Sequence, residues 1–290
     1  MTRASSSVKV GAAMVVAVAA LAPPAARAAA LEPGTVAAWN TYVAATEARI
    51  ERELRSPRGF LISDFQPTDS GARQVAVSGQ IPVREMRTID GSNRVIPVPD
   101  GLITHWRGSV FLPGVTLDAL LDRLKHPSER GPHQEDVLAL RVLQREPEQL
   151  RLFIRMTRTK IVTVTYDSEH RVDYRRHGRS RASSRSVATR IVEVDGVGTD
   201  HESAKPAGQD RGFLWRLNSY WRYEEVAGGV IVELESLTLS RAVPLGLGVV
   251  VEPIIDRIAR ESMTRTLANL RRTYAPMAVA RKFNRVEFPA

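Results

Sequence analysis

Apolar and polar residues alternate with a period of two over most of residues 102–241, which is the pattern of strands in an antiparallel sheet. Where the alternation is clearest, one parity carries Leu, Ile, Val and Met and the other carries Arg and Thr. Such strands have one dry face and one wet face. Strands are expected at residues 102–112, 136–145, 149–158, 160–175, 184–195, 213–226 and 230–241.

Helical spacing of apolar residues appears in three other places. Thr35–Leu54 predicts an amphipathic helix, and Leu117–His126 predicts a second helix with Thr116 as its N-cap. A long helix is expected over 253–273, with Pro253 at its first position and a length of about 31 Å. A polar turn region is expected at 127–135, with one more short helix in it. Short strands are expected at 73–77 and 81–87.

The hairpin formed by 213–226 and 230–241 divides its side chains between two faces. Gly228-Gly229 is typical of a tight hairpin turn, which pairs Ala227 with Val230 and sets Tyr223 opposite Leu234. One face is apolar with small hydroxyl residues between, and its members are Trp215, Leu217, Ser219, Trp221, Tyr223, Val232, Leu234, Ser236 and Thr238. The other face is largely polar, and its members are Asn218, Tyr220, Arg222, Glu224, Glu233, Glu235, Leu237 and Leu239.

Four stretches carry a resemblance to a known superfamily: HWRGSVFLPG-TLDALL, VTVTYDSEHRVDY, RSVATRIVEV and LNSYWRYEE-GG-VIVELESLTLSR-VP-GLG. Together they resemble the START-like (SRPBCC, helix-grip) superfamily, in particular its uncharacterised exported bacterial members, over roughly residues 100–274. The resemblance implies an α+β fold, in which a curved antiparallel sheet wraps around a long C-terminal helix. It also implies an apolar cavity between that sheet and that helix.

Three hypotheses about function follow. A lipid or another apolar or amphipathic molecule would be held by Trp215, Leu217, Ser219, Trp221, Tyr223, Leu234, Ser236, Ile254 and Ile258. A cyclase or aromatase type of enzyme would instead use the polar residues Tyr220, Arg222, Glu233 and Glu235, of which Arg222 and Glu235 could pair across the strands. A scaffold protein would have a filled core. We expect a binding protein rather than an enzyme.

The first thirty residues have the pattern of a secretory signal peptide. Arg3 and Lys9 precede the apolar run 10–22, and small residues at 26–30 fit two cleavage sites. A periplasmic or secreted protein is therefore expected, although it lacks cysteine and thus any disulfide. Without residues 1–28 the net charge falls from +9 to +6, because three basic residues and no acidic ones are removed. That charge does not indicate nucleic-acid binding.

The expected organisation is a signal peptide at 1–30, an extension with one amphipathic helix at 31–100, a START-like domain at 101–275 and a tail at 276–290. An arginine-rich stretch inside the domain predicts either a solvated loop or docking to an anionic membrane surface. Its members include Arg171, Arg175, Arg176, Arg179 and Arg181. The six histidines show no metal-ligand spacing, and no dinucleotide or phosphate-loop fingerprint is present, so neither a metal nor a cofactor is expected.

Overall fold

The structure is a computed structural model that describes residues 31–66, 71–130, 135–159, 163–242 and 248–274, without the side chains of 248–254. Its helices are α2 (Pro33–Leu54), the 3-10 helix η1 (Ile62–Phe65), α3 (Ala72–Val77), α4 (Leu117–Lys125) and α5 (Gly248–Tyr274). Its strands are β1 (Val83–Glu85), β2 (Gly101–Pro113), β3 (Val137–Glu146), β4 (Gln149–Thr159), β5 (Thr163–Arg176), β6 (Arg181–Asp195), β7 (Ser203–Ala204), β8 (Arg216–Val226) and β9 (Gly229–Arg241).

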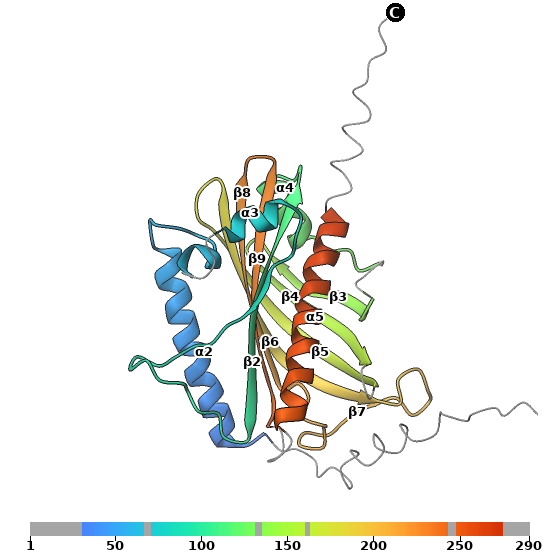
Figure 1. The fold of residues 1–290 in the computed structure, drawn as a ribbon. Coiled ribbons are helices and arrows are strands. Elements are labelled where there is room, and N and C mark those ends of the chain that lie inside the picture. Colours follow the sequence, from blue (N-terminus) through green and yellow to red (C-terminus); the bar gives the residue numbers. More distant parts are fainter. Residues whose placement is uncertain (1–30, 67–70, 131–134, 160–162, 243–247, 275–290) are drawn as a thin grey trace, which may run out of the picture.

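The strands form one antiparallel sheet in the order β1-β2-β9-β8-β6-β5-β4-β3, with β7 added to β6. The first long strand, β2, pairs with the last strand, β9, over its whole length. The α5 helix then crosses the sheet along one side, and α2 lies on the other side of the central strands (Figure 1). This arrangement confirms the predicted α+β helix-grip fold, in which the sheet curves around the C-terminal helix.

Two different kinds of contact hold α5 over the sheet. On the β2 side, Met263 and Leu267 are buried in the main apolar core. On the β3–β4 side the contacts are polar: Arg158 of β4 donates to the Ser262 hydroxyl of α5 at 2.6 Å, and Arg265 of α5 lies 3.3 Å from the Asp136 carboxylate. The helix is therefore anchored along two edges of the concave face, and the middle strands β8, β6 and β5 lie between these anchors.

The hairpin turn differs from the predicted one by two residues in register. Ala227 and Gly228 form the loop, Gly228 has a φ of 85°, and Val226 pairs with Gly229. Gly229 is needed for a different reason: a Cβ atom there would lie 2.2 Å from the Leu112 carbonyl oxygen. Because a shift of two leaves each side chain on its original side, the predicted division of β8 and β9 into two faces is retained.

Three other predictions about the elements are wrong. Residues 73–77 form the helix α3 instead of a strand, since Arg73 reaches from it to Asp64 at 2.7 Å and to Glu224 at 2.6 Å. Residues 127–130 form no helix, and 131–134 lie outside the described residues. The α5 helix begins five residues before Pro253, so this proline is the sixth residue of the helix, in its second turn, where it removes one backbone hydrogen bond.

Candidate functional site

The two faces of the β8–β9 hairpin are covered by different helices. Val232 and Leu234 belong to the core cluster that contains Met263 and Leu267 of α5. Leu237 and Leu239, which have the opposite parity on β9, pack with Trp39 and Tyr42 of α2. The apolar face predicted from the sequence is therefore the α5-facing side, and the polar face is the α2-facing side.

The predicted ligand-binding residues fall into three groups. Tyr223 and Leu234 are buried in the filled part of the core, where the Tyr223 hydroxyl lies 2.9 Å from that of Ser184. Further along the same side, the side chains are only half-buried, namely Leu217, Ser219, Trp221 and Ser236. Ile258 of α5 is half-buried as well, whereas the side chain of Ile254 lies outside the described residues.

Trp215 was expected on the α5-facing side, and this prediction is wrong. It precedes β8 and packs into the α2-facing cluster with Trp39 and Tyr220. Its indole nitrogen donates to Asp210 Oδ1 at 3.0 Å, and its backbone N–H donates to the Leu239 carbonyl at 2.8 Å. The alternation of faces therefore stops where the strand begins, because the chain turns at this point to bond with the loop before β8.

The exposure of the two faces is the reverse of what their polarity suggests. On the α2-facing side, Arg222 is 1% exposed, Glu233 is 1% exposed and Glu235 is 0% exposed. On the α5-facing side, the apolar Leu217 and Trp221 keep part of their surface accessible. Charged groups are thus buried while apolar groups beneath a helix are left partly uncovered, although burial of apolar surface is the main force that drives folding.

The residues of the alternative polar site belong to a buried charge network under α2 and η1. The predicted pairing of Arg222 with Glu235 is wrong: Arg222 lies opposite Glu233 in the sheet and donates to Glu53 of α2 at 2.5 Å. Arg222 also donates to the Phe60 carbonyl at 2.9 Å. Tyr220, the remaining member, donates its hydroxyl proton to Glu47 of α2 at 2.8 Å.

The two glutamates of the network are held by groups from several elements. Glu233 accepts the backbone N–H groups of Ile62 and Ser63, and Ser109 of β2 donates to it at 3.0 Å. Glu235 accepts from Arg49 of α2, and His105 Nε2 donates to it at 2.7 Å. Burial acts to raise the pKa of Glu235, but the His105 hydrogen bond and the Arg49 charge outweigh it and hold this pKa below its ordinary value.

One histidine lies on the α5-facing side. His170 of β5 is 6% exposed, and its Nε2 atom lies 3.0 Å from the Ser168 hydroxyl on the same face. Burial lowers the pKa of His170 to about 4, so the ring is neutral at physiological pH. Among the described residues, no three His, Asp or Glu side chains are grouped as metal ligands would be.

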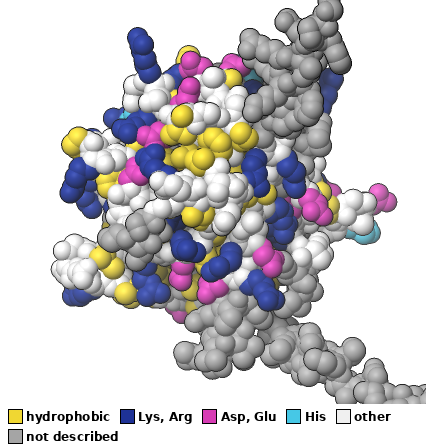
Figure 2. All heavy atoms as spheres, turned by 45° about the horizontal axis from the view of Figure 1, so that its top comes forward, with side chains coloured by type: hydrophobic (Ala, Val, Ile, Leu, Met, Phe, Trp, Pro, Cys, Tyr) yellow, Lys and Arg dark blue, Asp and Glu magenta, His cyan; other side chains and the backbone are white. Residues whose placement is uncertain are grey.

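The arginine-rich stretch forms the end of the β5–β6 hairpin, and several of its side chains pair with carboxylates. Arg175 lies 3.4 Å from Glu51, Arg181 lies 2.8 Å from Glu224, and Arg171 lies 3.2 Å from Asp173. Figure 2 shows the face at this end of the molecule, where basic and acidic side chains are interspersed around a hydrophobic patch. Membrane docking through these arginines stays a prediction. Among the described residues, no helix is long and apolar enough to cross a membrane.

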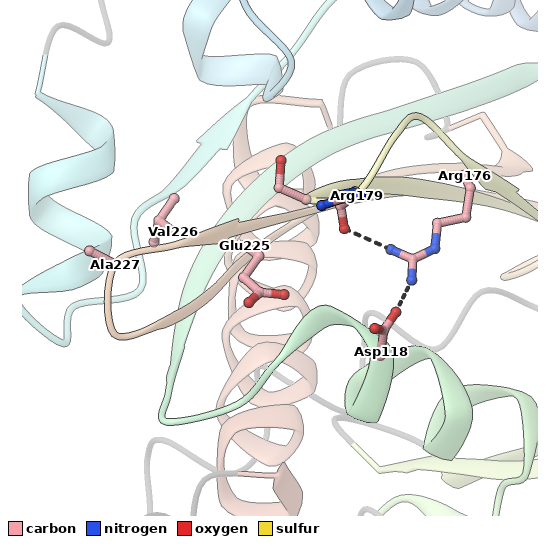
Figure 3. Close-up of a pocket in the computed structure, with 7 residues that line it drawn as sticks. Asp118, Arg176, Arg179, Glu225, Val226 and Ala227 are labelled. Carbon is pink, nitrogen blue, oxygen red and sulfur yellow. Dashed lines mark hydrogen bonds and ion pairs between the residues drawn. The ribbon is translucent and has the colours of Figure 1, made fainter.

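A hollow of about 630 Å³ lies at the same end of the molecule (Figure 3). It is lined by Asp118, Arg176, Arg179, Ser180, Glu225, Val226 and Ala227. Arg176 pairs with Asp118 and donates to the Arg179 carbonyl at 2.9 Å, while Glu225 accepts the Leu117 N–H at 2.7 Å. Asp118, Arg176 and Glu225 of this hollow thus bond to one another's elements or to the start of α4, and none of the predicted ligand-binding residues lines it.

No protein-family model matches the chain, and no curated protein matches its sequence. Solved structures that match include START-related proteins, as the sequence motifs predicted. A STAR-related lipid transfer protein from Xanthomonas axonopodis is 16% identical, with 66% of this chain and 98% of that chain covered and a TM-score of 0.43. Human StAR-related lipid transfer protein 5 is 15% identical, with 86% and 99% covered and a TM-score of 0.43.

The matches also include the Zhui aromatase/cyclase from Streptomyces sp. R1128, which is 11% identical. In that comparison 59% of this chain and 95% of the other are covered, with a TM-score of 0.36. Identities and TM-scores as low as these carry no information about the ligand or any reaction of this chain.

Proposed function

We propose that this protein binds an apolar or amphipathic small molecule, a lipid, between the α5-facing side of the sheet and α5. The observation that carries the proposal is the exposure of the hairpin: on its apolar side Leu217 and Trp221 stay half-buried, while Arg222, Glu233 and Glu235 on its charged side are fully buried. A ligand on Leu217, Ser219, Trp221 and Ser236 would complete the burial of that side. Covering about 300 Å² of apolar ligand surface is worth about 7.5 kcal/mol before the costs of binding, which is enough for micromolar affinity.

The enzyme hypothesis is not favoured by the position of its residues. Proton transfer requires the acid or base to reach the substrate within hydrogen-bonding distance. Tyr220, Arg222, Glu233 and Glu235 all lie on the α2-facing side, where Glu47, Glu53, Arg49 and backbone groups occupy them. A ligand under α5 would be separated from all four by the thickness of the sheet.

Native mass spectrometry of the purified full-length mature protein, combined with solvent extraction and lipid analysis, tests the proposal. We expect a co-purified apolar or amphipathic molecule, or a thermal shift with at least one member of a panel of lipids. A variant in which Ser219 is replaced by Trp fills the proposed space and should lose the ligand, while Ser183→Ala on the other face of the sheet should keep it. Recovery of no ligand together with no thermal shift would contradict the proposal.

We also propose that the protein acts outside the cytoplasm, on the basis of the N-terminal pattern alone. Cleavage after Ala28 or after Ala30 would give a mature chain that starts at Ala29 or at Leu31. N-terminal sequencing of protein from the periplasm and the culture medium tests this directly. An intact Met1 on protein found only in the cytoplasm would contradict it.

A further inference from the structure

One row of residues crosses the α5-facing side of the sheet and places three serines on neighbouring strands. In the register of the sheet, Trp106 of β2 lies opposite Ser236 of β9. Ser236 lies opposite Ser219 of β8, and Ser219 lies opposite Ser186 of β6. Because neighbouring strands are about 4.8 Å apart, the three hydroxyl groups mark a line of about 10 Å across the centre of the sheet.

The polar atoms of this row lack partners within the described part of the chain. Ser186, Ser219 and Ser236 are half-buried, and no hydrogen bond joins their hydroxyl groups to another described residue. Trp106 is 4% exposed, and its buried Nε1 atom likewise has no hydrogen-bond partner among the described residues. Buried polar groups in folded proteins are nearly always satisfied, so an unpaired indole N–H beside three free hydroxyls indicates a missing acceptor.

Apolar residues border the row along β8. Trp221 follows Ser219 by two residues, toward the hairpin turn, and Leu217 precedes it by two residues. Both side chains lie on the same face as Ser219, and both are half-buried. The row itself contains only neutral side chains. Arg260 of α5 lies against the face of the Trp106 ring, with its guanidinium 5.3 Å from the ring centre.

We propose that Ser186, Ser219, Ser236 and the Trp106 N–H form a hydrogen-bonding subsite for a neutral, oxygen-rich group of the ligand. This inference rests on the proposed function and narrows it to one class of molecule. The ligand carries two or three hydroxyl or carbonyl oxygens at about the spacing of neighbouring strands, attached to an apolar body that lies on Leu217 and Trp221. A glycerol ester has this chemistry, whereas a hydrocarbon or a simple ester offers too few polar atoms to use the row.

Calorimetric titration of the full-length mature protein with two matched probes tests the subsite. The probes are 1-decanoylglycerol and methyl decanoate, both used below their solubility limits in water. They share an acyl chain and differ in the hydroxyl groups. Each hydrogen bond gained is worth about a fivefold change in affinity, so the glyceride should bind at least tenfold more tightly than the ester. Decanoate, which adds a charge instead of hydroxyls, should bind no better than the ester.

Three variants separate the subsite from a general effect on the fold. The triple substitution of Ser186, Ser219 and Ser236 by Ala should reduce the preference for the glyceride over the ester to about the fivefold that the Trp106 N–H supplies, and should leave ester binding unchanged. Trp106→Phe keeps an aromatic ring and removes the N–H. It should lower the ratio of glyceride affinity to ester affinity about fivefold, and it gives a test even if the triple variant does not fold. Ser183→Ala, on the opposite face of β6, is the matched control and should leave the ratio unchanged.

The outcomes distinguish the subsite from the function on which it rests. Equal affinity of the parent protein for the glyceride and the ester, or tighter binding of decanoate, would overturn the subsite and leave the proposed function standing. A ratio that survives both the triple substitution and Trp106→Phe would overturn it as well. If none of the probes binds, and no lipid co-purifies, the proposed function itself fails.

Discussion

Replacing Arg222 by Met tests whether the buried charge network holds α2 and η1 on the sheet. Methionine keeps much of the apolar stem and removes the guanidinium, which bonds to Glu53 at 2.5 Å and to the Phe60 carbonyl at 2.9 Å. Breaking a buried ion pair from one side costs about 3–5 kcal/mol, and the stranded carbonyl adds about 1 kcal/mol. Together these two costs are about 4–6 kcal/mol; because Arg49 also contacts Glu53 at 3.0 Å, we expect the lower end, a loss of about 4 kcal/mol.

Urea unfolding followed by circular dichroism, with linear extrapolation to water, measures this loss. The matched control is Arg171→Met, because Arg171 is 47% exposed in its side chain and pairs with Asp173 at the surface, so its loss should stay within about 1 kcal/mol. The Arg222 effect should be nearly the same in 0.05 M and 0.5 M salt, since buried pairs are screened little. Adding Glu53→Gln should restore part of the stability. A loss below about 1 kcal/mol for Arg222→Met would refute the reasoning.

Three further predictions concern other parts of the fold. Gly229→Ala should cost about 3 kcal/mol, because its Cβ would lie 2.2 Å from the Leu112 carbonyl, whereas Gly34→Ala, with nothing within 4 Å, should be neutral or slightly stabilising in the same urea assay. The pKa of His170 is about 4 in the folded protein and about 6.5 in the unfolded chain. The stability linked to this group is therefore complete above pH 6.5 and is lost as the pH falls to 4. His170→Gln should remove about 3 kcal/mol of this pH dependence, and an unchanged slope of unfolding free energy against pH would count against the prediction. Ser219→Trp should change the free energy of unfolding by less than about 1 kcal/mol relative to the parent protein if space exists beneath α5. A larger loss of stability would show a filled core.

The sequence alone was enough to predict the sheet, the hairpin and the long C-terminal helix, because alternation and turn residues are local signals. The exact pairing of the hairpin was not predictable in this way. Either glycine of Gly228-Gly229 could serve a tight turn, and the choice depends on how closely Leu112 of β2 approaches Gly229. That approach brings together residues far apart in the chain, and the local sequence contains no trace of it.

The role of the polar face was missed for a similar reason. Arg222, Glu233 and Glu235 look like a solvated face of a two-sided hairpin, and only the packing of α2 and η1 on this face buries them. Their partners Arg49 and Glu53 come from α2, four residues apart on one helix face. Charges at this spacing on an N-terminal amphipathic helix, matched by charges on a central strand, are the signal that could have identified the network.

The most direct test of the central claim asks which face of the sheet a bound ligand contacts. A decanoylglycerol with a photoreactive diazirine in its chain, cross-linked to the full-length mature protein, would be mapped by peptide mass spectrometry. The account predicts labels on Leu217 and Trp221 of β8 and on Ile258 of α5, and loss of these labels in Ser219→Trp. Labels concentrated on the α2-facing side, at residues such as Trp39 or Leu237, or in the hollow beside α4, would contradict it.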